Sequence, residues 1–341
     1  MKKRGLLWML VCILVLSGCK APREIETTLE PPATVEPTPD PSAQEIKDFF
    51  RRYVDTKERP IAVMVDNDDK NARPHAGLDE AYLIYEMVIE GGATRFLAFF
   101  RDAATEKIGP VRSSRHYFLD YLMEHDGIYV HYGWSPKAIQ DISAFGIEKI
   151  NGVLGTDGHI FWREEKFRGD WHSAYTSVEK IKEITTQKGY ATETGEGGLS
   201  YADTYFTLPA ENSAETILLT YSGFYSTGYC YNSETGLYEK TIDHAPHVMQ
   251  NGNRLAVKNV IVQFATDVSL GDGSDRRDLN TTGSGRGYYL TGGAYEEITW
   301  SKASRQADTV YMKADGTPLV LNPGKTIVNI ISSSANVTIE T

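Results

Sequence analysis

Apolar positions in the first half of the chain change their spacing from one segment to the next. Short apolar or alternating runs, which predict strands, lie at residues 61–67, 82–90, 95–101 and 128–133. Runs with helical spacing lie at residues 116–126, 136–146 and 177–189. Strands and helices mixed in this order predict an α+β fold, with a mixed α/β domain over residues 49–190.

Helical spacing disappears in the second half of the chain. Residues 191–202 are polar and rich in Gly, so we expect them to form an interdomain linker. Short β-rich runs such as TILLTY, NVIVQF and KTIVNII follow, separated by Gly, Asn and Asp turns. This pattern predicts a mostly β domain over residues 203–341.

The N-terminus has the features of an export signal. Lys2, Lys3 and Arg4 precede an apolar run from Leu6 to Leu16, which is shorter than the roughly 20 residues of a membrane-spanning helix. The run ends in Leu-Ser-Gly-Cys19, a sequence that resembles a bacterial lipobox. We therefore predict a signal peptide over residues 1–18 and a lipid anchor on Cys19, on the extracytoplasmic face of the cell membrane.

Residues 19–48 follow as a Pro-, Thr- and Glu-rich stretch with few large apolar side chains. Such a composition buries too little surface to fold, so we expect a tether. Removal of the signal peptide would leave 32 basic against 46 acidic residues, a net charge of about −14. This charge argues against nucleic acid as a partner. With Cys19 acylated, Cys230 has no cysteine with which to form an internal disulfide.

A charged hairpin is predicted around Gly91 and Gly92. A two-residue turn would place Glu86 opposite Leu97 and align Glu86, Glu90, Arg95 and Arg101 on one face. This face is either a solvated row of salt bridges or the wall of a charged pocket, because carboxylates that are buried and paired are frequent in binding sites.

The stretch Gly109-Pro-Val-Arg-Ser-Ser-Arg115 precedes a predicted helix. Ser113 or Ser114 would cap this helix, and Arg112 and Arg115 would add guanidinium donors beside its free N–H groups. The composition suits a phosphate, sulfate or carboxylate. The alternative is a capped helix whose arginines pair with Glu86 or Glu90.

The stretch His131-Tyr-Gly-Trp-Ser135-Pro136 ends a predicted strand and begins a helix, with Ser135 as N-cap and Pro136 in the first turn. α/β folds place ligands at such strand ends, so His131 and Ser135 are candidate ligand contacts. Ser135 lacks the G-x-S-x-G sequence of a nucleophile elbow.

Two other segments carry weaker signals. Asp66, Asn67 and Asp68 end a predicted strand, which suits either a ligand loop or an ordinary turn. Arg168, Trp171 and His172 combine aromatic and basic side chains that suit the rim of a sugar or anion site. No metal-ligand set or cofactor-binding loop is complete in the sequence, so we expect neither a metal nor a cofactor.

Several blocks resemble YerB-like bacterial lipoproteins. RPIAVMVDN, EGGATRFLAFF, IGPVRSSRHYFLDY and VHYGWSP resemble the N-terminal domain of this family, and GLYEKTIDHAPHV and LNPGKTIVNII resemble its C-terminal domain. The resemblance implies a membrane-anchored, extracytoplasmic protein of two domains. It implies no catalytic residue, because the family has no assigned biochemical function.

Two classes of function remain open. The protein could bind an anionic small molecule, a cell-wall fragment or an envelope protein, or it could be a hydrolase or transferase that acts on a wall glycan, peptide or phosphorylated polymer. Binding ranks first, because no catalytic set is complete in the sequence. The candidate ligand-binding residues are Glu86, Glu90, Arg95, Arg101, Arg112, Ser113, Ser114, Arg115, His131, Ser135 and His172.

Overall fold

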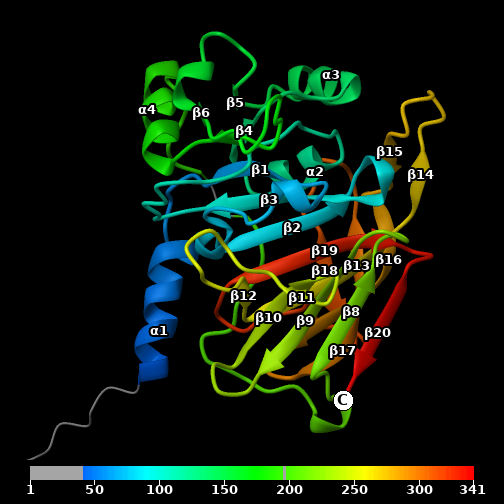
Figure 1. Cartoon of the computed structure of the whole chain (residues 1–341). Helices are drawn as coiled ribbons and strands as arrows, with labels where there is room; N and C mark the ends of the chain where they lie inside the picture. The colour runs from blue at the N-terminus through cyan, green and yellow to red at the C-terminus, as the bar shows by residue number, and fades with distance from the viewer. Residues whose placement is uncertain (1–40, 195–196) are drawn as a thin grey trace, which may run out of the picture. The chain divides into compact units, whose positions relative to one another are not determined.

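The structure is a computed structural model that describes residues 41–194 and 197–341. The predicted signal peptide, Cys19 and most of the predicted tether lie outside the described residues. The described residues belong to a single compact unit. The following account concerns this unit alone (Figure 1).

Helices are few and short among the described residues. The α-helices are α1 (Pro41–Phe49), α2 (Phe118–Glu124), α3 (Pro136–Ala144) and α4 (Val178–Lys188). Shorter helical turns are a π-helical turn at Phe50–Val54 and 3-10 turns at Lys70–Ala72, Leu78–Glu80, Glu90–Gly92, Gly158–Ile160 and Ala210–Asn212. The prediction of a tether up to residue 48 is wrong for residues 41–48, which are helical. At the end of this helix, buried Phe49 packs against Tyr53 and Tyr201 and so stabilises α1.

A ten-stranded sheet runs through the unit and takes five strands from each half of the chain. Its order is β18 (Val310–Lys313), β17 (Ala294–Lys302), β16 (Gly283–Thr291), β13 (Asn259–Ala265), β19 (Thr326–Ser332), β2 (Leu83–Val88), β3 (Thr94–Phe100), β1 (Ile61–Asn67), β4 (Ile128–His131) and β5 (Lys149–Asn151). The two halves meet where β19 and β2 pair in parallel.

A smaller sheet is built entirely from the second half of the chain. Its order is β11 (Ala245–Pro246), β10 (Leu237–Ile242), β9 (Ser226–Asn232), β8 (Thr216–Thr220) and β20 (Asn336–Glu340), with β12 (Ala256–Val257) also paired to β10. Two short ribbons pair β14 (Asp267–Ser269) with β15 (Arg277–Leu279), and β6 (Trp162–Arg163) with β7 (Ala174–Tyr175).

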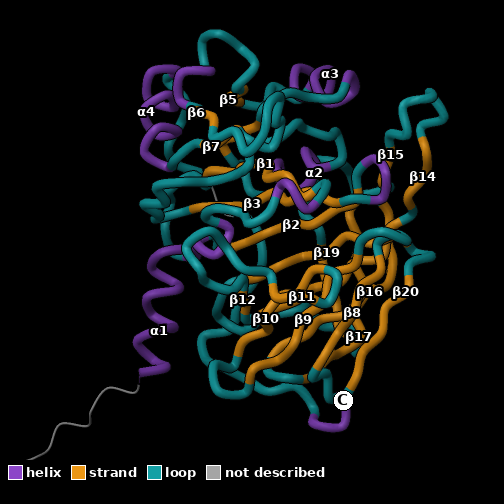
Figure 2. The backbone as a smooth tube through the Cα atoms, in the orientation of Figure 1, coloured by secondary structure: helices purple, strands orange, loops and turns teal. Residues whose placement is uncertain are grey.

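The large sheet is covered on both faces. On one face, Phe96 and Ile327 pack with Tyr229 and Tyr238 of the smaller sheet, and Ile181 of α4 joins the same core. On the other face, Phe118 and Leu122 of α2 pack with Leu97 and other strand residues. Figure 2 shows α3 and α4 beside strands of the first half, and the smaller sheet beside strands of the second half. Apolar side chains on both faces explain why the central strands are buried along their whole length.

The predicted fold class is confirmed: the N-terminal domain is mixed α/β, and the C-terminal domain is mostly β. The strands at residues 61–67 and 128–133 and the helices at 136–146 and 177–189 also lie where the sequence predicts them. Because both halves share one sheet, the two domains are continuous through their backbone hydrogen bonds. The domain boundaries at residues 190 and 203 remain a prediction.

The hairpin of β2 and β3 differs from its predicted form by one residue. Glu86 lies opposite Phe96 rather than Leu97, because a five-residue connection containing the 3-10 turn Glu90–Gly92 replaces the predicted two-residue turn. Both Gly91 and Gly92 have positive φ, which that connection requires. Because side chains alternate along a strand, the shift places Glu86 and Arg95 on opposite faces of the sheet.

Candidate functional site

Residues 111–114 occupy the gap that opens between β1 and β4. These strands pair in parallel only from Ile61 to Val63. Beyond that point, the Arg112 amide donates to Met64 O (2.9 Å), the Tyr132 amide donates to Arg112 O (2.9 Å), and the Ser114 amide donates to Gly133 O (3.0 Å). The segment therefore extends the sheet at the carboxyl ends of β1 and β4, where α/β folds bind ligands.

This arrangement corrects the prediction that Ser113 or Ser114 caps a helix. Helix α2 begins later, at Phe118, after Tyr117, and no side chain caps it. The Ser114 amide is already bonded within the sheet, and Ser114 Oγ accepts from the Tyr129 hydroxyl (2.6 Å). Ser135 does cap α3, with Pro136 in the first turn, as the sequence predicts.

A buried carboxylate, Asp66, lies at the end of β1 and is fully enclosed. Arg95 Nε donates to Asp66 Oδ1 (3.3 Å), and His172 Nδ1 lies 2.9 Å from Oδ2. Arg112 Nε lies 2.8 Å from the same Oδ2. We call Asp66, Asp68, Arg95, Arg112 and His172 the Asp66 cluster.

Charge in the Asp66 cluster controls how its members ionise. Burial disfavours the Asp66 carboxylate, but the His172 hydrogen bond and the Arg95 and Arg112 charges outweigh this and lower its pKa to about 2. Burial likewise disfavours the His172 imidazolium, but the bond to Asp66 and the charges of Asp68, Asp66 and Asp69 raise its pKa. Burial and the neighbouring Asp66 charge raise the pKa of Asp68.

The outer side of the cluster is partly open to solvent. The side chains of Arg112 and Asp68 are each 23% exposed, and their closest N–O distance is 3.8 Å. Trp171 is 62% exposed, and the Arg112 guanidinium lies 5.7 Å from the centre of its ring. A guanidinium held from behind by a buried carboxylate and flanked by an indole ring can bind an anion that also presents a flat or apolar surface.

Three members of the cluster have the composition of a metal site. Asp66, Asp68 and His172 each offer one ligand atom, and these atoms lie within 4.8 Å of one another. In the neutral ring, however, the Trp171 indole N–H donates to His172 Nε2 (2.8 Å), so the proton of that ring lies on Nδ1 and is directed toward Asp66. A metal would need the Nδ1 lone pair and would lie beside two arginines, so the donor set favours the His–carboxylate bond.

Four of the predicted ligand-binding residues meet at this place. Arg95, Arg112 and His172 contact Asp66 directly, and Ser113 contributes its carbonyl, which accepts from Arg95 Nη1 (2.7 Å). Ser113 Oγ donates away from the cluster, to Tyr132 O (3.2 Å).

The predicted residues that follow Ser113 lie close by but have other partners. Arg115 forms a two-pronged ion pair with Glu90, at 2.7 and 2.8 Å. The Ser135 amide donates to Ser114 O (3.1 Å), so the two segments are joined by backbone rather than separated by a crevice. His131 is buried, stacks on Tyr129 and directs Nδ1–H toward Gly133 O (2.7 Å).

Glu86 and Arg101 lie elsewhere. Glu86 is on the opposite face of the sheet, where its Oε2 accepts from Lys240 (2.8 Å) of the second half of the chain. Arg101 follows β3 at the far end of that strand and donates to Tyr53 O (2.8 Å). The predicted single charged face is therefore wrong, and the one-residue change of register explains why.

Asp66 and Trp171 are not among the ligand-binding residues predicted from the sequence. Asp66 and Asp68 follow the apolar run IAVMV, and the sequence offered no way to separate a ligand loop from an ordinary turn. Trp171 and His172 lie more than 100 residues further on, so their approach to Asp66 depends on the tertiary fold. The signal in the sequence that could have identified Asp66 was its position as a polar residue directly after a fully apolar run.

Comparison with known proteins assigns the family. Residues 52–191 match the N-terminal domain of DUF3048, a protein of unknown function, and residues 217–328 match its C-terminal domain. A Bacillus subtilis (strain 168) protein named "Putative lipoprotein YerB" is 34% identical over 280 residues, which cover 81% of this chain and 82% of that protein. This chain belongs to the DUF3048 family.

A solved structure supports the fold as well. The crystal structure of YerB protein from Bacillus subtilis matches with a TM-score of 0.73 and 30% identity, over 83% of this chain and 94% of that one. The resemblance to YerB-like lipoproteins is thus confirmed. The DUF3048 N-terminal region contains the whole Asp66 cluster, whereas Lys240 belongs to the C-terminal region. Across residues 41–194 and 197–341, no helix is both long and apolar enough to span a membrane.

Proposed function

We propose that this protein is an envelope lipoprotein, anchored to the extracytoplasmic face of the membrane through Cys19, that binds an anionic envelope-derived ligand at the Asp66 cluster. The ligand class is a cell-wall fragment that bears a carboxylate or phosphate. The observation that carries the proposal is the position of the Arg112 side chain. Its guanidinium is paired with the buried Asp66 carboxylate, and part of the same side chain is exposed beside Trp171. Of the predicted residues, Arg95, Ser113 and His172 would support Arg112.

Electrostatics support an anion at this position. Asp66 is neutralised by Arg95 and His172 as well as by Arg112, so the buried charge does not depend on Arg112 alone. The raised pKa of His172 adds positive charge at mildly acidic pH. The hydrolase or transferase alternative has less support, because the Glu86 carboxylate is fully buried and the Glu90 carboxylate is paired with Arg115.

Binding of wall fragments tests the proposal. Muramidase-released fragments should quench the fluorescence of the full-length protein in detergent, and Trp171→Phe should reduce this signal. Arg112→Gln should weaken binding by about tenfold or more, and Arg112→Lys should not restore it, because an ammonium lacks the guanidinium fork. Arg286→Gln, on an exposed arginine of β16, is the matched control.

The same binding experiments have outcomes that would contradict the proposal and one that would define the ligand further. Equal binding by wild type and Arg112→Gln would overturn the placement of the ligand. Competition by phosphate but not acetate, or the reverse, would identify which anionic group is bound. Capture of a protein instead of a wall fragment would favour an envelope protein partner, and release of a cleaved product would favour the hydrolase or transferase.

Membrane anchoring has its own test. Cys19→Ala should remove the acyl chains and release the protein from the membrane fraction, or leave the signal peptide uncleaved. Wild type should leave that fraction only with detergent. Detergent-dependent attachment that persists in a processed Cys19→Ala protein would contradict the lipid anchor.

A further inference from the structure

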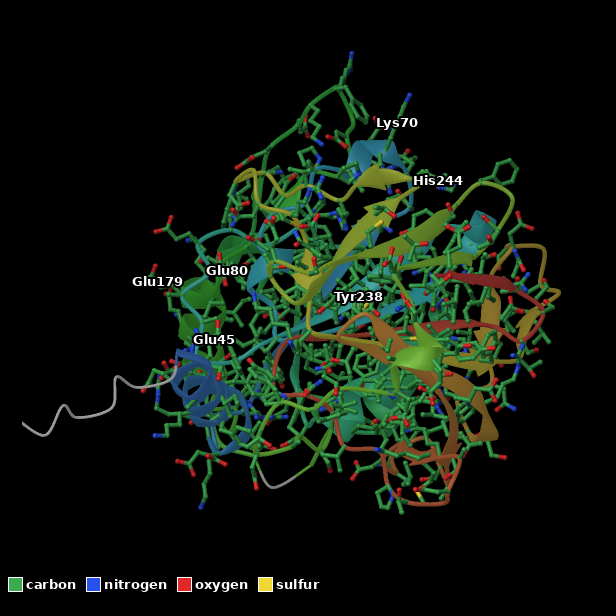
Figure 3. All side chains as sticks on the ribbon, turned by 90° about the horizontal axis from the view of Figure 1, so that it is seen from below. Glu45, Lys70, Glu80, Glu179, Tyr238 and His244 are labelled. Carbon is green, nitrogen blue, oxygen red and sulfur yellow. The ribbon has the colours of Figure 1, made fainter. Side chains whose placement is uncertain are left out.

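A cleft lies between the turn that follows β1 and the hairpin of β10 and β11. Its volume is about 400 Å³, and its walls include Lys70, Arg73 and Pro74 from the first half of the chain and Asp243, Pro246 and His247 from the second. Figure 3 shows Lys70 and His244, which follows Asp243, at the same end of the unit. The cleft is separate from the Asp66 cluster, and none of the five members of that cluster lines it.

Two buried histidines, His247 in the wall of this cleft and His75 bonded to it, have a fixed hydrogen-bond direction. His75 Nε2 lies 2.6 Å from the backbone oxygen of Asp66, which can only accept, so Nε2 carries the His75 proton. Burial lowers the pKa of His75 to about 3, so the ring is neutral and its Nδ1 is an acceptor. His247 Nε2 lies 2.8 Å from that Nδ1 and must therefore be the donor.

The remaining nitrogen of His247 has no proton and, among the described residues, no partner. Burial lowers the pKa of His247, so this ring is neutral as well, and its single proton is on Nε2. Nδ1 is thus a bare acceptor, and it is buried without a hydrogen-bond partner among the described residues. Buried polar atoms in native proteins nearly always have a partner, which here must come from outside the described residues.

Charges around the cleft restrict the partner. Lys70 is exposed and Arg73 is half-buried, so two cations line the cleft against one carboxylate, Asp243. Asp243 Oδ1 is already occupied by the Ser226 amide (2.9 Å). Two cations disfavour an ammonium group as the donor to His247 and favour an anionic group beside a hydroxyl.

We propose that this cleft binds a small anion that also carries a hydroxyl group, of the class of phosphorylated polyols. The hydroxyl donates to His247 Nδ1, and the anionic group lies against Lys70 and Arg73. The site joins the turn after β1 to the β10–β11 hairpin, so its ligand contacts both DUF3048 regions. The inference does not depend on the proposed function of the Asp66 cluster.

Calorimetry on the full-length protein in detergent tests this, with sn-glycerol 3-phosphate, inorganic phosphate and glycerol as probes. Wild type should bind glycerol 3-phosphate about tenfold or more tightly than inorganic phosphate, since one hydrogen bond to a buried acceptor accounts for a factor of that size. His247→Phe should abolish this preference. Lys70→Gln, on an exposed side chain, should weaken both anions several-fold.

Three further variants serve as controls. His244→Gln changes a neighbouring exposed histidine and should have no effect. His75→Gln keeps an acceptor for His247 Nε2–H and should retain the preference for glycerol 3-phosphate. Arg112→Gln should remove any phosphate binding at the Asp66 cluster, and the preference for glycerol 3-phosphate should persist in this variant, which separates this site from the proposed function.

The inference is overturned if wild type shows no preference for glycerol 3-phosphate over phosphate, or if His247→Phe keeps that preference. An unfolded His247→Phe protein would leave the decision to Lys70→Gln. Unchanged binding of both anions by Lys70→Gln would then overturn the site.

Discussion

Asp66 and Glu86 are both fully buried carboxylates, and they lie on the two strands that flank β3. Asp66 is opposite Arg95, and Glu86 is opposite Phe96. Because successive side chains of β3 point to opposite faces, the two carboxylates are separated by the sheet itself. Their surroundings differ in how completely the charge is enclosed.

Glu86 belongs to a closed set of partners. Thr94 and Tyr225 hydroxyls donate to Oε1 (2.8 and 2.5 Å), and Lys240 donates to Oε2 (2.8 Å). Lys240 also contacts Thr227, and each of these side chains is buried. Two of the three side-chain partners of Glu86, Tyr225 and Lys240, come from the second half of the chain, so this carboxylate links the smaller sheet to the larger one.

Asp66 is equally buried but has partners that reach solvent. Arg112 is partly exposed, and Trp171, which donates to His172, is mostly exposed. A buried carboxylate whose partners are all buried contributes to stability alone. A buried carboxylate that orients a partly exposed cation can also position that cation for a ligand. The exposure of the partners, more than that of the carboxylate, distinguishes the two clusters.

The largest expected effect is on the closed cluster. Glu86→Gln would leave Lys240 buried without a counter-charge, which should lower the free energy of unfolding by about 3–5 kcal/mol. Urea denaturation of full-length protein measures it. The double variant Glu86→Gln/Lys240→Met removes both charges and should recover a substantial part of the loss. A near-zero loss for the single variant would show that Glu86 is not the enclosed counter-charge of Lys240.

An intermediate effect concerns the pH dependence of the open cluster. The pKa of Asp66 is about 2 when folded and near 3.9 when unfolded, so its stabilisation is present above about pH 4 and is lost as pH falls toward 2. The difference in unfolding free energy between wild type and Asp66→Asn should therefore shrink by about 2 kcal/mol across that window. Urea denaturation at several pH values measures it.

The difference in unfolding free energy between wild type and Asp66→Asn should also decrease at higher pH. Because the pKa of His172 is raised in the fold, its contribution is complete below about pH 6.5 and declines as pH rises through the folded pKa. The difference between wild type and Asp66→Asn should thus be largest between about pH 4 and 6.5. Asp48→Asn, on an exposed carboxylate of α1, should show no such profile. A difference independent of pH would contradict the charged state of Asp66.

The smallest effect is expected for the ion pair Glu90–Arg115, whose carboxylate is more exposed than that of Asp66 or Glu86. Glu90 is 22% and Arg115 is 13% exposed, so water can solvate either charge if its partner is removed. Glu90→Gln should cost at most about 1 kcal/mol by urea denaturation. A loss as large as that of Glu86→Gln would show that partial exposure does not separate these carboxylates.

Much of the local structure could be predicted from the sequence. The spacing of apolar residues located β1, β4, α3 and α4, and Ser135-Pro136 located the start of α3. The prediction for Ser113 and Ser114 failed because two neighbouring strands supplied partners for the backbone between them. A cap competes with such sheet bonds, and only the fold decides which is formed.

For the candidate site, the sequence alone determined the residue types: arginines around a Ser-Ser pair, a histidine beside a tryptophan, and carboxylates at the end of an apolar strand. Only the tertiary structure decided their partners. Arg112 and His172 converge on Asp66, whereas Glu86 faces Lys240. The physical reason is that local spacing sets which residues can share a face. The length of one connection, between β2 and β3, sets which face Glu86 occupies, and partners over 100 residues apart meet only when the sheet is assembled.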